Sequence, residues 1–134
     1  IILGVVLTIV FSIILLRIFG FQYRFGILIG GAIAICGASA AMAISSVLPK
    51  DEKSNERLTF VVLGVTIIST FCMILYPLLT NYLDMSERSS GIFFGATIHD
   101  VAQVIGAGFT VSEQTGETAT LIKLFRVTLL FPLY

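Results

Sequence analysis

A histidine and an aspartate stand side by side in the middle of an apolar stretch. His99 and Asp100 are followed by Gln103, and residues 91–109 around them are mostly apolar or small. A charge at the centre of a bilayer costs about 2.5–3.5 kcal/mol on insertion scales, so an ionisable pair in a membrane segment marks a functional site by default. The pair therefore predicts a site that binds or moves a charged species.

Proton or cation binding is the chemistry open to this pair. The carboxyl of Asp100 and the imidazole of His99 both change charge when they bind a proton. On a continuous helix they lie in one sector with small residues and Gln103, where a backbone or a substrate approaches closely. A structural network is the alternative, in which Asp100 caps an interrupted helix and His99 bonds to a carbonyl. The sequence leaves both interpretations open.

The composition places this pair in a membrane protein. The chain is 57% hydrophobic and 12% charged, with a mean hydropathy of +1.03. Soluble domains carry about 25% charged residues. Eight basic and eight acidic residues give a formal net charge of zero, which is not the basic footprint of a nucleic-acid-binding protein. We expect a lipid bilayer as a partner and no nucleic acid.

Motifs for catalysis, cofactors or metals are missing from the sequence. His99 is the only histidine, and no hydrolase elbow, phosphate-binding loop or zinc motif accompanies it. Cys36 and Cys72 lie in apolar segments without a CxxC pattern, as expected for small buried residues. We therefore expect no enzyme activity, no cofactor and no metal site.

Apolar segments separated by short polar connections predict a polytopic transmembrane helical bundle. Segments longer than about 20 residues span the hydrocarbon layer as helices, and they are too long for the strands of a membrane barrel. The first and last segments read as truncated spans, so we expect residues 1–134 to be a single transmembrane domain fragment of a longer all-α protein. The expected spans are residues 1–19, 25–48, 58–83, 90–109 and 118–134.

Small residues in the middle of the second span predict an interruption. The run from Cys36 to Ala41 contains Gly37, Ala38 and Ser39 and no large side chain. Discontinuous helices in secondary transporters place free backbone amides at the bilayer midplane, where they bind anionic groups. Tight helix packing through the small-xxx-small pattern that begins at Gly26 is the alternative.

Two cations lie inside the last span. Lys123 and Arg126 are three residues apart, on one face of a helix. Their insertion cost exceeds what the surrounding apolar residues return, so this segment needs a bundle and partners for its charges. We expect Arg126 to point into the bundle and to pair with a buried acid, most plausibly Asp100. Lys123 has the further option of extending toward the interface.

Membrane orientation is undecided by these spans. If connections alternate between the two sides, each side carries three basic residues, and the positive-inside rule gives a tie. Arg17, Arg24 and Arg88 fall on one side, and Lys50, Lys53 and Arg57 on the other.

Several motifs together resemble one family. The chain reads ICGASA from Ile35, YP from Tyr76, GATIHDVAQVIGAG from Gly95 and KLFRV from Lys123. In this order and spacing, it resembles the YeiH-type family of sulfate exporters. That resemblance implies a multi-pass protein of the bacterial inner membrane that exports sulfate or a related sulfur-containing anion by a secondary mechanism. It also implies an architecture like that of inverted-repeat secondary transporters.

The predicted site combines these features. We expect the anion to be held by freed amides, polar side chains and a cation, and the coupling ion, H+ or Na+, to be carried by His99 and Asp100. An anion channel and a non-transporting membrane subunit are the other functions left open, and so is a homo-oligomer. The expected anion-binding residues are Gly37, Ala38, Ser39, Thr97, Gln103 and Arg126.

Overall fold

The computed structural model describes residues 2–128, which form seven helices and no strand. One helix, α4, has 29 residues and is about 43 Å long at 1.5 Å per residue. The others have 10 to 17 residues. The bounds are α1 Ile2–Ile18, α2 Tyr23–Ala34, α3 Ala38–Val47, α4 Ser54–Tyr82, α5 Glu87–Thr97, α6 Val101–Val111 and α7 Glu113–Thr128.

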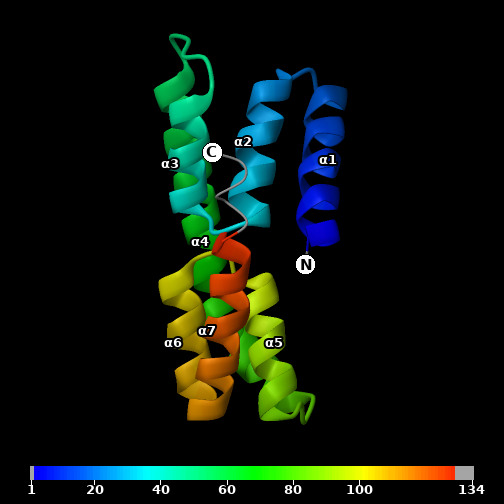
Figure 1. Cartoon of the computed structure of the whole chain (residues 1–134), viewed down its shortest axis with the longest axis vertical. Helices are drawn as coiled ribbons and strands as arrows, with labels where there is room; N and C mark the ends of the chain where they lie inside the picture. Colours follow the sequence, from blue (N-terminus) through cyan, green and yellow to red (C-terminus); the bar gives the residue numbers. More distant parts are fainter. Residues whose placement is uncertain (1, 129–134) are drawn as a thin grey trace.

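Helix α4 runs along the whole molecule, and the other helices divide between its two halves. Helices α1, α2 and α3 occupy one half, and α5, α6 and α7 occupy the other (Figure 1). Among the described helices, α4 alone is long and apolar enough to cross a membrane. Helices α2, α3, α5 and α6, which have both ends inside the described part of the chain, are each too short to cross a hydrocarbon layer that is about 30 Å thick.

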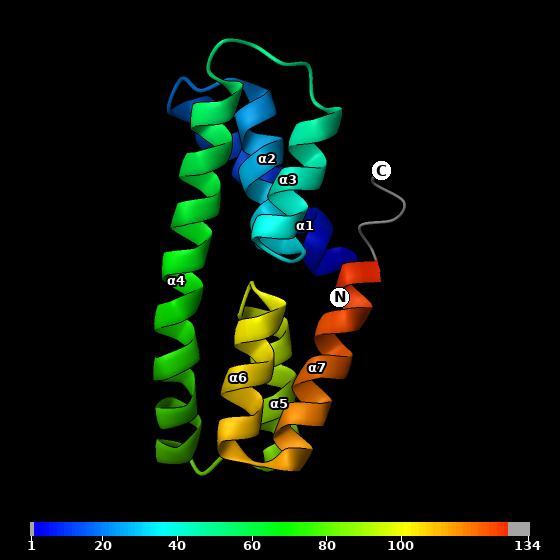
Figure 2. The same ribbon diagram turned by 90° about the vertical axis from the view of Figure 1, so that its left-hand side faces the viewer.

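The second predicted span is interrupted, as its small residues predict, but it does not continue to the far side. Helix α2 ends at Ala34 and α3 begins at Ala38. Helix α2 runs toward the middle of the molecule, and α3 returns to the end from which α2 came (Figure 2). Gly37 supplies the turn, because its φ of 66° lies in the left-handed region that favours glycine. Residues 25–48 thus form a helical hairpin.

The fourth predicted span, residues 90–109, is also a hairpin, so the chain adopts the interrupted helix that the sequence left open as the alternative to a continuous one. Helix α5 ends at Thr97, α6 begins at Val101, and the two lie side by side in the lower half of the molecule (Figure 2). The carboxylate of Asp100 caps α6 by accepting from the amides of Ala102 and Gln103 at 2.9 and 3.3 Å. An N-cap aspartate favours a new helix start at this position.

The last helix begins earlier than the predicted start at residue 118. Ser112 ends α6, and its hydroxyl accepts from the amide of Thr115 at 3.1 Å. This cap lets α7 start at Glu113 after a turn of one residue. The predicted span ran to residue 134, and residues 129–134 lie outside the described part of the chain.

Each hairpin packs on α4 through its own apolar cluster. The first cluster joins α2, α3 and α4 and contains Phe25, Leu28, Ala41, Val61 and Val65. The second joins α5, α6 and α7 and includes Phe94, Ile98, Val104 and Ala119, with Met73 and Tyr76 of α4 packed against it. These clusters hold the two hairpins against one continuous support, which fixes how far their turns lie apart.

Close packing of α5 on α7 requires small residues. A Cβ at Gly95 would lie 2.5 Å from the carbonyl oxygen of Ala119, and one at Gly91 would lie 2.8 Å from that of Thr115. Both distances fall below any real carbon–oxygen contact, so the two backbones could not approach this closely with larger residues. The small-xxx-small pattern of α5 therefore sets the position of α7.

We predict that Gly95→Ala destabilises the protein by about 1–3 kcal/mol, because the added methyl group meets backbone that cannot move aside. Gly64→Ala is the matched control, since a Cβ at Gly64 would have no heavy atom within 4 Å. The measurement is the thermal unfolding of both variants in detergent. Equal losses of stability in the two variants would contradict the close packing of α5 on α7.

Candidate functional site

The turns of the two hairpins meet at the middle of the molecule. We call them the hairpin tips: residues 35–37 of the first hairpin and residues 98–100 of the second. A Cβ at Gly37 would lie 3.5 Å from the carbonyl oxygen of His99 and 3.0 Å from Val65 of α4. Gly37 is buried. The tips are therefore in contact, with α4 covering one side of the contact.

Lys123 of α7 binds both tips. Its ammonium donates to the carbonyl oxygen of Ile35 at 3.0 Å and to that of Ile98 at 2.8 Å, and the residue is 0% exposed. These carbonyls belong to the residues that end α2 and α5, where a helix has no amide of its own to offer. Lys123 thus does not extend to the interface, and it supplies hydrogen bonds that two interrupted helices lack.

Arg126 repeats this arrangement one turn further along α7. Its guanidinium donates to the carbonyl oxygens of Ala34 in α2 and Ala96 in α5. The side chain points into the bundle as predicted, but its partners are carbonyls rather than the predicted carboxylate of Asp100. Within residues 2–128, the one ion pair closer than 4.0 Å joins Arg57 and Asp51 at the far end of α4.

Asp100 and His99 lie in the second tip. Asp100 is partly buried, and its capping oxygen is Oδ1. His99 is partly buried and lies within electrostatic range of Lys123 and Arg126. The structure therefore shows the capping role that the sequence left open for Asp100, and it places the acid and the imidazole in the tip whose Ile98 carbonyl Lys123 binds.

Three other predicted anion-binding residues have side chains that already donate hydrogen bonds within the protein. The hydroxyl of Ser39 donates to the carbonyl oxygen of Cys36 at 3.2 Å, and that of Thr97 donates to Phe93 at 2.6 Å. The amide group of Gln103 donates to the hydroxyl of Thr70 in α4 at 3.0 Å. Ala38 is the first residue of α3, beside the first tip. Among these residues, the groups that remain available to an anion are mainly the backbone amides at the start of α3.

Several buried polar atoms at the tips have no hydrogen-bond partner among the described residues. They include Nδ1 of His99, Oε1 of Gln103 and Nε of Arg126, together with the hydroxyl of Ser69 in α4. Ser69 is 0% exposed. It is one turn from Val65, which faces Gly37, and one turn from Met73, which faces Gly106. The unpaired groups therefore gather around the contact between the hairpins.

Sequence reasoning missed two residues of this site. The sequence held a sign that Lys123 belongs to the site, because Lys123 shares a helix face with Arg126. However, the lysine side chain is long enough to reach the membrane interface, so this sign was not decisive. Nothing in the sequence pointed to Ser69, since a serine in an apolar helix usually bonds to the backbone of the preceding turn. Among the described residues, no cluster of three or more His, Cys, Asp or Glu side chains could hold a metal ion.

The charges at the tips are unbalanced. Lys123 and Arg126 bring two positive charges, and Asp100 brings one negative charge. The remaining charged residues lie in the connections at the two ends of the molecule or in the helix turns next to those connections. With His99 neutral, this region carries one excess positive charge, which favours an anion over a cation.

Comparison of the sequence with protein families places the chain in a known group. The family described as Conserved hypothetical protein 698 matches residues 1–134. The chain belongs to this family. Membership agrees with the family resemblance drawn from the sequence motifs.

Relatives in this family are membrane proteins of bacteria. The chain is 57% identical over 129 residues to the UPF0324 membrane protein TauZ of Paracoccus denitrificans, which covers 96% of the chain and 38% of that protein. It is 56% identical to a UPF0324 membrane protein of Rhizobium meliloti (96% of the chain, 37% of the relative) and 53% identical to one of Chlorobaculum tepidum (96% and 36%). No solved structure matches the chain.

We predict that Lys123→Met lowers the stability of the protein, because the carbonyls of Ile35 and Ile98 lose their donor. A buried carbonyl without a partner costs about 1–3 kcal/mol. Lys53→Met is the matched control, since Lys53 is exposed at the start of α4. Thermal unfolding in detergent measures both variants. A Lys123→Met protein as stable as the control variant would contradict the joining of the tips by Lys123.

Proposed function

We propose that the whole protein is a secondary transporter that exports sulfate or a related small sulfur-containing anion across the bacterial inner membrane. The single observation that supports this function is the excess positive charge at the hairpin tips, where Lys123 and Arg126 donate to backbone carbonyls and Asp100 is the one acid in the second tip. The choice of a sulfur-containing anion rests on the family resemblance. The chain spans less than two fifths of the length of the relatives it matches, so this proposal concerns the longer protein.

In this proposal, the first tip binds the anion. The start of α6 is already filled by the carboxylate of Asp100, which takes the amides of Ala102 and Gln103. The start of α3 has Gly37 as its N-cap and no side-chain cap, so the amides after it are free to bind an anion. Arg126 donates to the carbonyl oxygen of Ala34, next to the first tip, and in this proposal it supplies the compensating charge.

The second tip binds the cation, H+ or Na+, whose movement is coupled to that of the anion. An ionised Asp100 beside the anion would repel it, so loading of the anion must accompany the binding of a cation, H+ or Na+. His99 is adjacent and within range of the same cations. Proton uptake by this pair therefore links the charge of the site to the pH on the side from which it loads.

Hairpins that enter from opposite ends support a polytopic, multi-pass architecture. The first hairpin reaches the middle from one end of α4, and the second reaches it from the other end (Figure 2). Opposed hairpins of this kind suit the inverted repeats of secondary transporters, in which substrate sites lie near the midplane between the repeats. The apolar residues exposed on α1 and α4 then face lipid or the remainder of the longer protein.

Flux measurements test this function against its two alternatives. We predict that the full-length protein in proteoliposomes catalyses counterflow driven by a sulfate gradient, which saturates with sulfate concentration, and net sulfate flux that depends on an ion gradient. A channel would conduct quickly without saturation, and a non-transporting subunit would give no flux above empty liposomes. Either of the latter results would overturn the proposal.

We predict that Asp100→Asn abolishes flux driven by a pH gradient while the protein still folds. Asparagine keeps the capping oxygen for α6 but cannot take up a proton. His99→Gln should shift the pH optimum, because a group with an ordinary pKa of about 6.5 is removed from the titration. Asp84→Asn, in the connection before α5, is the matched control. Wild-type pH dependence in the Asp100→Asn protein would leave both residues with structural roles alone.

A further inference from the structure

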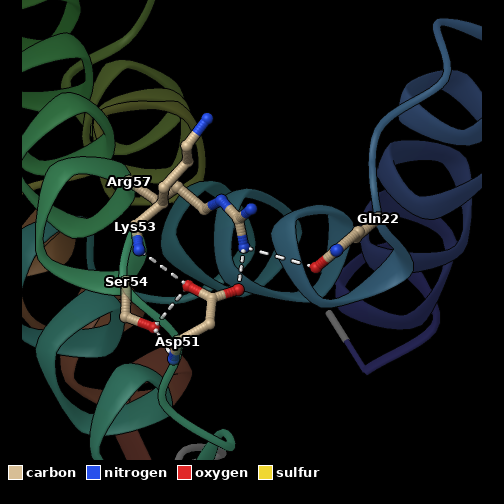
Figure 3. Close-up of polar contacts among 5 residues, drawn as sticks. All are labelled: Gln22, Asp51, Lys53, Ser54 and Arg57. Carbon is tan, nitrogen blue, oxygen red and sulfur yellow. Dashed lines mark hydrogen bonds and ion pairs between the residues drawn. The ribbon is translucent and has the colours of Figure 1, made fainter.

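Both connections on the first half of the molecule lie at the same end. Arg57, at the start of α4, donates to the side chain of Gln22, at the start of α2, at 3.4 Å. The same guanidinium pairs with Asp51 at 2.9 Å, and Asp51 also accepts from Ser54 and Lys53 (Figure 3). Because α2 and α3 form a hairpin, the connection before α2 and the connection after α3 meet here.

The other two connections meet at the opposite end. The hydroxyl of Thr115, in the first turn of α7, donates to the carbonyl oxygen of Glu87, in the first turn of α5, at 3.1 Å. The connection from α4 to α5 and the turn from α6 to α7 therefore lie together. The 29 residues of α4 separate this end from the other.

This pairing of connections changes the count of basic residues on each side. Alternating spans would put three on each side, but the hairpins return their chains to the end from which they came. Of the eight basic residues, five lie at the first end, one lies at the second end, and Lys123 and Arg126 lie at the tips. The five are Arg17, Arg24, Lys50, Lys53 and Arg57, and the one is Arg88.

Short connections with an excess of lysine and arginine stay on the cytoplasmic side of a membrane, and acidic residues contribute little to this bias. All of these connections are short: residues 19–22, 48–53, 83–86 and 112. The acidic residues near the first end, such as Asp51, therefore do not cancel its five cations. The anionic lipids of the cytoplasmic leaflet also attract cations that lie at its surface.

We infer that the end formed by residues 17–24 and 48–57 faces the cytoplasm and meets its anionic leaflet, and that the end formed by residues 83–88 and 112–117 faces the opposite side. The hairpin of α2 and α3 then enters the membrane from the cytoplasm. The hairpin of α5 and α6, with Asp100 and His99 at its tip, enters from outside. This orientation does not depend on which ion or anion the protein carries.

Labelling of single cysteines by a membrane-impermeant maleimide tests the orientation in the intact, full-length protein. The background protein has its native cysteines replaced by alanine. Gln22→Cys and Glu52→Cys probe the first end, and Glu87→Cys and Gln114→Cys probe the second, all at exposed positions. In right-side-out vesicles we expect labelling at positions 87 and 114 only, with labelling at 22 and 52 appearing after the membrane is permeabilised.

Two other outcomes would overturn the inference, each in a different way. Labelling of positions 22 and 52 in sealed vesicles, with 87 and 114 protected, would mean that the orientation is reversed. Labelling of 22 and 52 from opposite sides would mean that residues 25–48 cross the membrane, so that the hairpin itself is wrong. The background protein without an introduced cysteine controls for label that reaches other sites.

Discussion

The fold depends on hydrogen bonds to backbone carbonyls at the ends of two interrupted helices. In a membrane interior no water can satisfy these groups, and each unpaired one is costly. Lys123 and Arg126 donate to four such carbonyls, two in each hairpin. A single helix, α7, therefore completes the backbone hydrogen bonding of both hairpins and joins their tips.

The same two residues, Lys123 and Arg126, give the region of the tips its positive charge. A helix ends with partial negative charge, so cations at the ends of α2 and α5 are partly balanced by the carbonyls they bind. That balance explains how two cations can lie deep in an apolar protein with a single acid near them. What remains is a positive excess near the first tip, and the proposed anion site rests on it.

Precise placement of α7 follows from small residues. Gly91 and Gly95 bring α5 within backbone contact of α7, and Gly108 does the same for α6, where a Cβ would lie 2.7 Å from Gly116. Lys123 reaches the carbonyls of both tips only at this separation. The glycines of the second hairpin thus help to position Lys123 and Arg126, although none of them contacts these two side chains.

The sequence by itself determined that the chain is apolar and helical, and it predicted that His99, Asp100 and Arg126 belong to one region. It also predicted an interruption near Gly37, with an unbroken, tightly packed helix as the alternative that the structure then excluded. Composition and local residue types carry this information, because insertion costs and helix-breaking residues act where they stand. Only the tertiary structure decided which way the chain leaves each interruption. Local sequence cannot specify this, since the groups that satisfy the broken ends come from far along the chain: Lys123 is 88 residues from Ile35. The hairpins, the role of Lys123 and the gathering of basic residues at one end are therefore visible only in the tertiary structure.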